Sequence, residues 1–228
     1  HLKPFFTNKP LVNISTFDVD RYKKKRVDDG AAKGSINREL AALSHLFSMA
    51  IEWKWIGSQP AKIKRFKEDK GRIVYLTVDQ VNKFKEAAKK DRCEVIYPFA
   101  VIGSETSMRK AEILSIKLED IDVDRKVIFI PKAKAGAREQ PITSGLAEFL
   151  RGYIKAAGKD QVWLFPAESS KTGHRVSIEK PWRRVVVAAG LDVKQVVRHT
   201  LRHTAITHLV QAGVDLPTVK RISGHKTL

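Results

Sequence analysis

The segment from Val197 to His203 places two arginines and two histidines within seven residues of a basic chain. Read as a helix, it brings His199 and Arg202 to one face, because residues three apart are neighbours on a helix surface. Another face carries an apolar residue at every fourth position: Leu201, Ala205 and Leu209. The apolar stripe predicts a helix that packs onto a core and leaves a cationic face for a phosphate.

The charge balance of the chain indicates the kind of partner. Its 228 residues include 43 Lys and Arg against 25 Asp and Glu, a net charge of +18, which favours a polyanion, most commonly nucleic acid. No apolar run approaches the roughly 18 to 20 residues of a membrane-spanning helix, and the N-terminal residues lack the pattern of a secretory signal. We expect a soluble cytoplasmic protein without membrane contact.

Cysteine and histidine patterns give no support for a metal or another cofactor. The single cysteine, Cys93, excludes an internal disulfide and a cysteine-rich zinc site, and its apolar neighbours predict a buried structural thiol. The chain has no His-Glu-x-x-His motif. We therefore expect neither a metal site nor a cofactor.

The first part of the chain predicts two helices, residues 16–27 and 35–53. Leu40, Leu43, Phe47 and Ala50 fall on one face of the second helix. Asp28-Asp29-Gly30 indicates a turn between them, and Gly34-Ser35 indicates the N-cap of the second helix. After Pro60 the apolar pattern fades into a charged stretch. We therefore predict a helical domain at residues 1–66, a linker at 67–73 and a second domain at 74–228.

The second part predicts more helices and one hairpin. Thr77 and Gln80 form a capping box at the start of a helix that runs to about Lys89. Strand-forming residues on both sides of a loop near Gly136 predict a β-hairpin within residues 126–143, and residues 163–165 suit a short strand. The remaining apolar patterns predict helices at residues 94–103, 107–117, 147–157, 177–189, 200–211 and 216–223. The expected fold class is mainly α with a small antiparallel β-sheet (α+β).

Arg109 lies where a helix alone would not favour it. A cation in the first turn opposes the helix dipole, whereas a helix N-terminus and a guanidinium together attract an anion such as phosphate. Glu112, one turn later, could orient that guanidinium or a neighbouring histidine. The alternative is a simple i,i+3 ion pair worth a few tenths of a kcal/mol.

Other basic residues leave two interpretations open. Lys134, in the predicted hairpin loop, is either a solvated charge or a side chain that reaches a ligand. The run from Tyr22 to Arg26 is either a solvated helix face or a stripe along a DNA backbone. We favour the second interpretation and take as candidates for backbone contact Lys23, Lys24, Lys25, Arg26 and Lys132. His203 and His208 lie away from the face of His199 and Arg202 and are weaker candidates than His199.

These motifs together resemble the tyrosine recombinases of the phage integrase family, and the resemblance spans essentially the whole chain. Thr-Ser-Met-Arg109-Lys-Ala-Glu112 is similar to the first arginine box, Lys134 to the hairpin lysine, His199 to Arg202 to the His-x-x-Arg box, and Gly-His225 to the late Gly-His. The first domain resembles the core-DNA-binding domain, and the second the catalytic domain.

The resemblance implies a mechanism without metal or ATP, in which a tyrosine attacks a DNA phosphate and forms a 3′-phosphotyrosyl link. Arg109 and Arg202 would clamp the non-bridging oxygens, and His199 and His225 would add hydrogen bonds. Lys134 would protonate the leaving 5′-oxygen. Glu112 would hold the cationic cluster in register.

The family's nucleophilic tyrosine falls about nine residues after the Gly-His, whereas this sequence ends at Leu228. The tyrosines Tyr22, Tyr75, Tyr97 and Tyr153 do not stand in that position. We expect a clipped chain that is inactive in cleavage and monomeric in solution, from a protein that forms a homotetramer on double-stranded DNA with an inverted-repeat core site. The alternatives are a type IB topoisomerase relative and a catalytically silent, sequence-specific DNA-binding protein on the same scaffold.

Overall fold

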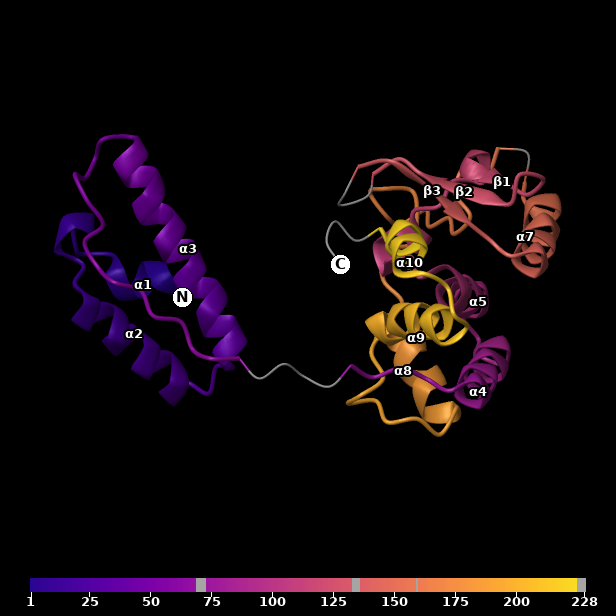
Figure 1. Ribbon diagram of the computed structural model, residues 1–228, viewed down its shortest axis with the longest axis horizontal. Helices are drawn as coiled ribbons and strands as arrows, with labels where there is room; N and C mark the ends of the chain where they lie inside the picture. The colour runs from indigo at the N-terminus through magenta and orange to yellow at the C-terminus, as the bar shows by residue number, and fades with distance from the viewer. Residues whose placement is uncertain (69–72, 133–135, 159, 225–228) are drawn as a thin grey trace. The chain divides into compact units, whose positions relative to one another are not determined.

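The computed structural model describes residues 1–68, 73–132, 136–158 and 160–224 (Figure 1). The chain divides into two compact units, His1–Arg72 and Ile73–Leu228. Each unit has its own cluster of buried apolar side chains. Of the helices in these ranges, none combines the length and the apolar character needed to cross a membrane.

The first unit is helical, with α1 (Leu2–Phe6), η1 (Leu11–Asn13), α2 (Thr16–Asp28) and α3 (Lys33–Glu52). Ser15 and Asp18 start α2 as a capping box: the Ser15 amide donates to the Asp18 carboxylate at 2.8 Å, and the Asp18 amide donates to the Ser15 hydroxyl at 3.2 Å. The apolar face predicted for α3 is confirmed, because its members are all buried: Leu40, Leu43, Phe47 and Ala50.

The connection between α2 and α3 confirms the predicted turn but not the predicted N-cap. Gly30 has a φ of 75° and its amide donates to the Val27 carbonyl, which closes α2. The amides of Ser35 and Ile36 both donate to the Ala32 carbonyl, so the helix is already formed when the chain reaches Ser35. The N-cap is therefore Ala32, which has no side-chain oxygen to accept a hydrogen bond, and the prediction of Gly34-Ser35 was wrong.

The second unit begins with α4 (Val78–Lys89), α5 (Ile96–Thr106), α6 (Lys110–Leu114) and η2 (Leu118–Asp120). The capping box of α4 is confirmed: the Thr77 amide donates to Gln80 Oε1 at 2.9 Å, and the Gln80 amide donates to Thr77 Oγ1 at 3.3 Å. The helix predicted at 107–117 is wrong in extent. Ser107 takes a left-handed conformation that ends α5, so α6 starts only at Lys110, with Arg109 as its N-cap.

The predicted hairpin is present and belongs to an antiparallel sheet with the order β1 (Ile121–Asp122), β2 (Val127–Ile130) and β3 (Arg138–Pro141). In the hairpin, Val127 pairs with Pro141 and Ile130 with Arg138. The sequence analysis did not predict β1. Residues 163–165 form no strand of their own, and Trp163 makes only an isolated bridge to Lys117.

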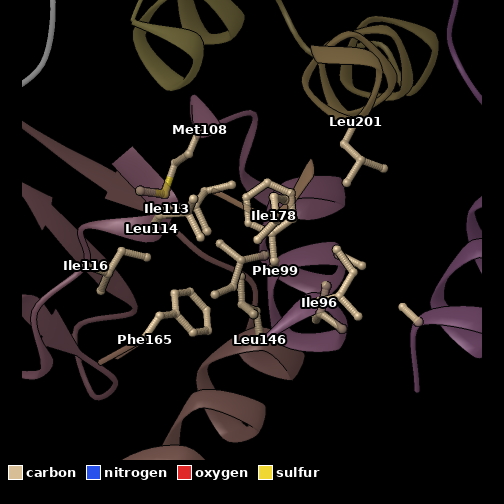
Figure 2. Packing of buried hydrophobic residues seen from close by; sticks show 14 of the residues in the cluster. Ile96, Phe99, Met108, Ile113, Leu114, Ile116, Leu146, Phe165, Ile178 and Leu201 are labelled. Atoms are coloured by element: carbon tan, nitrogen blue, oxygen red, sulfur yellow. The ribbon is translucent and has the colours of Figure 1, made fainter. Parts of the chain in front are cut away.

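The remaining helices are α7 (Ser144–Ala156), α8 (Glu179–Ala188), α9 (Arg198–Gln211) and α10 (Leu216–Ser223). Within this unit, α5 lies between the sheet and the group formed by α4, α8 and α9 (Figure 1). Figure 2 shows Leu201 pointing from α9 toward the buried cluster that contains Phe99 and Ile178. A Cβ on Gly103 of α5 would lie 3.1 Å from Leu201 Cδ1, so this glycine lets α5 and α9 approach closely.

Candidate active site

Helix α9 packs one face onto the core, as the sequence predicted: Leu201 and Ala205 are buried, and Leu209 is half-buried. The face of His199 and Arg202 is not left free along its length. Arg202 is also buried, with 6% of its surface exposed, whereas His199 near the start of the helix is exposed. A buried arginine is rare unless its charge is compensated, so the surroundings of Arg202 define the site.

The guanidinium of Arg202 joins two helix ends. Its Nη1 donates to the Ser107 carbonyl at the end of α5, and its Nη2 donates to the Ser223 carbonyl at the end of α10 at 2.6 Å. Carbonyls at a helix C-terminus have no partner within the helix and carry the negative end of its dipole, so they suit a cation. Burial and the charge of Arg109 lower the pKa of Arg202 to about 10, which still leaves it charged at neutral pH.

Arg109 and Glu112 form the second part of the site. The Arg109 amide donates to Glu112 Oε2 at 2.8 Å, and Arg109 Nη1 donates to Glu112 Oε1 at 2.9 Å. Burial by itself would raise the pKa of Glu112, but these hydrogen bonds and the charge of Arg138 keep it below its ordinary value. Glu112 therefore stays ionised and fixes Arg109, whose side chain is 27% exposed and still accessible.

The sequence analysis missed a third arginine of the cluster. Arg138 of β3 donates from Nη2 to Glu112 Oε2 at 3.2 Å and from Nη1 to the Ile222 carbonyl of α10 at 3.0 Å. Burial and the charge of Arg109 lower its pKa, while Glu112 raises it. The alternation of side chains along the strand places Arg138 on the same face as Gln140, which is fully buried. Polar residues at alternate positions are normally assigned to the solvent face of a strand, so this alternation did not mark Arg138 as buried.

The other histidines of α9 have different surroundings. His203 is half-buried, and burial together with the charges of His199 and Arg202 lowers its pKa. His208 Nε2 lies 3.0 Å from the Leu76 carbonyl, outside the arginine cluster. His208 thus contacts the start of the second unit, whereas the charges of the His199 and Arg202 face act on His203.

Two predicted site residues, Lys134 and His225, lie outside the described residues. Lys132, at the end of β2, is exposed and lines a pocket with Phe129 and Trp163. Figure 1 places the hairpin and the end of α10, the elements that flank the two residues, in the same unit as α9.

The basic side chains of α2 differ in exposure. Lys24 and Lys25 are exposed, and Lys25 Nζ lies 3.6 Å from Asp29 Oδ1 at the surface. Arg26, with 11% of its side chain exposed, binds Glu39 through Nε and Nη2, both at 3.0 Å. Lys23 has 16% of its side chain exposed and lies over the Phe66 ring. Lys24 and Lys25 are therefore better placed than the other two to meet a DNA backbone.

Tyr22 is unsuited to act as a nucleophile. It is 1% exposed and donates its hydroxyl hydrogen bond to Glu39 at 2.7 Å. Burial and the neighbouring carboxylate raise its pKa far above the ordinary tyrosine value. Burial also raises the pKa of Tyr153.

Taken together, the described residues place the guanidinium groups of Arg109, Arg138 and Arg202 around the carboxylate of Glu112. One carboxylate cannot neutralise three cations, so the cluster has an excess of positive charge at its accessible member, Arg109. Such a cluster stabilises a bound anion, and a phosphate is the anion whose oxygens match planar guanidinium donors.

Comparison with known proteins identifies the family of the chain. The model of the phage integrase family matches residues 74–228, nearly the whole second unit. The chain belongs to the phage integrase family. It is 25% identical over 213 residues to the tyrosine recombinase XerA of Pyrococcus furiosus, covering 92% of this chain and 72% of that protein. It is 24% identical to the tyrosine recombinase XerD of Pasteurella multocida, covering 96% of this chain and 76% of that protein.

Solved structures show the same fold. An integrase of the transposon Tn1549 in complex with a circular intermediate DNA superposes with a TM-score of 0.80 at 20% identity, covering 99% of this chain and 83% of that one. A lambda integrase dimer bound to a core site superposes with a TM-score of 0.73 at 21% identity, covering 96% of this chain and 81% of that one. The predicted fold class is confirmed.

Proposed function

We propose that this chain forms the core-binding and catalytic domains of a site-specific DNA recombinase that acts by transesterification through a 3′-phosphotyrosyl intermediate. The observation that carries the proposal is the excess of guanidinium charge around Glu112, because the transition state of phosphoryl transfer gathers negative charge on the non-bridging oxygens. Family membership and the DNA complexes of structurally similar integrases support the same substrate.

In this mechanism the arginines divide the work. Arg109, the accessible guanidinium, binds a non-bridging oxygen of the scissile phosphate. Arg202 is held by two main-chain carbonyls, so its positive charge is fixed in place and stabilises the same phosphate without rearrangement. Glu112 keeps Arg109 in that position.

The remaining roles follow the family resemblance. His199, exposed at the start of α9, donates a hydrogen bond to the phosphate, as does His225. Lys134 protonates the 5′-oxygen as it leaves, since expelling an alkoxide at neutral pH is costly without a proton donor. The nucleophile is a tyrosine about nine residues after His225.

The proposed DNA partner is a duplex core site with inverted repeats, bound by a homotetramer of the whole protein in the bacterial nucleoid. Lys24 and Lys25 on α2 contact its backbone, with Lys132 on the catalytic unit. Binding weakens steeply as salt rises, because each phosphate contact releases counterions.

The test is a covalent trapping experiment. The protein is expressed from its natural coding sequence, read through Leu228 to the stop codon. It is incubated with a duplex selected from a random pool by its affinity for this protein and nicked at successive positions. We expect an adduct that survives denaturing electrophoresis. Arg109→Lys and Arg202→Lys should each slow its formation by about 10²- to 10³-fold.

Arg151→Gln is the matched control, because this arginine on α7 pairs only with exposed carboxylates among the described residues. It should leave the rate unchanged. Tight binding without any adduct would support a silent DNA-binding protein instead. Relaxation of supercoiled plasmid without sequence preference would support a type IB topoisomerase.

A further inference from the structure

Arg138 makes contacts that the proposed mechanism does not use. Its guanidinium connects three elements of the second unit: its own strand β3, Glu112 of α6 and the last turn of α10. Only 12% of its side chain is exposed. It is therefore too deeply placed to serve mainly as a contact for a DNA backbone.

Arg138 shares its contact with the end of α10 with a second arginine. Arg138 Nη1 binds the Ile222 carbonyl at 3.0 Å, and Arg202 Nη2 binds the next carbonyl, that of Ser223, at 2.6 Å. Two arginines from different elements thus bind successive carbonyls at the negative end of one helix. The position of the end of α10 depends on both of them.

Gly224 has a role in the same contact. A Cβ on this residue would lie 2.9 Å from Arg138 Nε and 3.3 Å from its Cδ and Cζ, and the backbone φ is 66°. The glycine is required for its left-handed conformation and for the space that Arg138 occupies. Arg138 Nε is buried without a hydrogen-bond partner in the described chain, so packing against Gly224, rather than hydrogen bonding, fixes this side of the guanidinium.

The contact with Glu112 extends to Arg109. Glu112 Oε2 accepts from Arg138 Nη2 and from the Arg109 amide, while Oε1 accepts from Arg109 Nη1. Among the described residues, removing Arg138 leaves the Glu112 carboxylate bound only to Arg109 and free to rotate away from β3. The guanidinium of Arg109 would then lose its fixed orientation.

We propose that Arg138 is a positioning residue of the recombination site: it locks Glu112, and through it Arg109, to the end of α10 that Arg202 also binds. This inference rests on the proposed function, since its effect is expressed in DNA cleavage. Arg138 itself does not touch the phosphate. It sets the relative placement of the two arginines that do.

The experiment compares Arg138→Gln and Arg138→Lys with Arg125→Gln in the trapping assay described above, using the same selected duplex. Arg125 is the matched control, because it lies next to the same hairpin and, among the described residues, its guanidinium pairs with exposed Glu139. For each variant, three quantities are measured: affinity for the intact duplex, thermal midpoint and the single-turnover rate constant of adduct formation.

We expect both Arg138 variants to bind DNA as the wild type does and to form the adduct about 10²-fold more slowly, the usual effect of a displacement near 1 Å. Lys restores the charge but not the planar, multidentate geometry, so it should not rescue the rate. A rate restored by Lys would show that charge alone matters and overturn the proposal. Weaker DNA binding with an unchanged rate constant would mark Arg138 as a backbone contact and also overturn it.

A double-mutant comparison, made at temperatures where every variant is folded, distinguishes a positioning role of Arg138 from a merely structural one. Gly224→Ala should slow adduct formation strongly in the wild type and much less when Arg138 is already Gln, because the clash is with Arg138. Additive effects would contradict the proposal.

A readout without DNA separates this inference from the proposed function. The carboxyl ¹³C signal of Glu112 is titrated in the wild type and in Arg138→Gln. Among the described residues, the charged groups facing Glu112 are Arg109, Arg138 and Arg202, so removing one of these cations should raise the pKa of Glu112. An unchanged titration would overturn the contact even if the wild type cleaves. Absence of an adduct in the wild type would instead reject the proposed function.

Discussion

Ser107 combines a left-handed backbone conformation with a hydrogen bond to the candidate site. It has a φ of 54° and is fully buried, and its hydroxyl has no hydrogen-bond partner in the described chain. The left-handed conformation costs a non-glycine residue about 1 to 2 kcal/mol. This conformation turns the Ser107 carbonyl to Arg202, so the strain is held in place by the site.

We expect Ser107→Gly to raise the free energy of unfolding by about 1 kcal/mol, because relief of the left-handed strain exceeds the entropy that glycine loses on folding. Urea denaturation measures it. Ser107→Ala is the control, since it removes the unpartnered hydroxyl but keeps the Cβ that causes the strain. A stabilisation by Ala equal to that by Gly would assign the effect to the hydroxyl instead.

Among single residues, the sequence predicted those whose partners lie within one helical turn. Arg109 and Glu112 are one turn apart, and His199 and Arg202 share a helix face, so their grouping follows from helix geometry. Arg138 could not be found in this way, because its partners Glu112 and Ile222 are 26 and 84 residues away. The left-handed conformation of Ser107 was not predicted either, because serine shows no preference for that conformation.

At the scale of elements, α9 supports the start of the second unit through two side chains. The buried Leu76 amide donates to Thr204 Oγ1 at 2.9 Å, and the Leu76 carbonyl lies 3.0 Å from His208 Nε2. Both main-chain groups of Leu76 are thus satisfied by a helix far away in sequence. Thr204 is itself fully buried, so water cannot replace it.

We predict that Thr204→Val lowers the free energy of unfolding of the second unit by about 1 to 3 kcal/mol, the usual result of leaving a buried amide without a partner. Thr204→Ser keeps the hydroxyl and loses only a methyl group. It should therefore retain the hydrogen bond and lose less stability. Chemical denaturation of both variants checks this, and a Val variant as stable as the wild type would show that the hydrogen bond to the Leu76 amide does not contribute to stability.

The elements that the sequence predicted well are those with local signals. Thr77 and Gln80 define the start of α4 through atoms three residues apart. The two-residue strand β1 exists only because Ile121 and Asp122 pair with β2. The end of α5 depends on Ser107, whose carbonyl is bound by α9. Boundaries that depend on contacts with distant elements cannot be read from periodicity alone.

At the scale of the whole molecule, the described residues form two separate cores. The first gathers around Tyr22, Leu40 and Phe47, and the second around Phe99, Leu150 and Trp182. In the first unit, buried Asn37 donates to the Glu68 carboxylate at 2.6 Å and to the Phe66 carbonyl at 2.9 Å, so its side-chain amide is satisfied within that unit.

We expect His1–Arg72 and Ile73–Leu228, expressed separately, to fold on their own. The larger piece should unfold with the same thermal midpoint as the corresponding transition of the whole chain. The smaller piece should melt at a lower temperature, because a short domain buries a smaller fraction of its surface.

Tryptophan fluorescence separates the two transitions in the whole chain. Trp182 is 2% exposed in the second unit, whereas Trp53 and Trp55 of the first are 50% and 65% exposed. Unfolding of the second unit therefore changes the tryptophan emission far more than unfolding of the first. Circular dichroism detects the unfolding of the first unit through its helices. A first unit that is unfolded in isolation, or one that melts together with Trp182 in the whole chain, would show that its core depends on the second unit for stability.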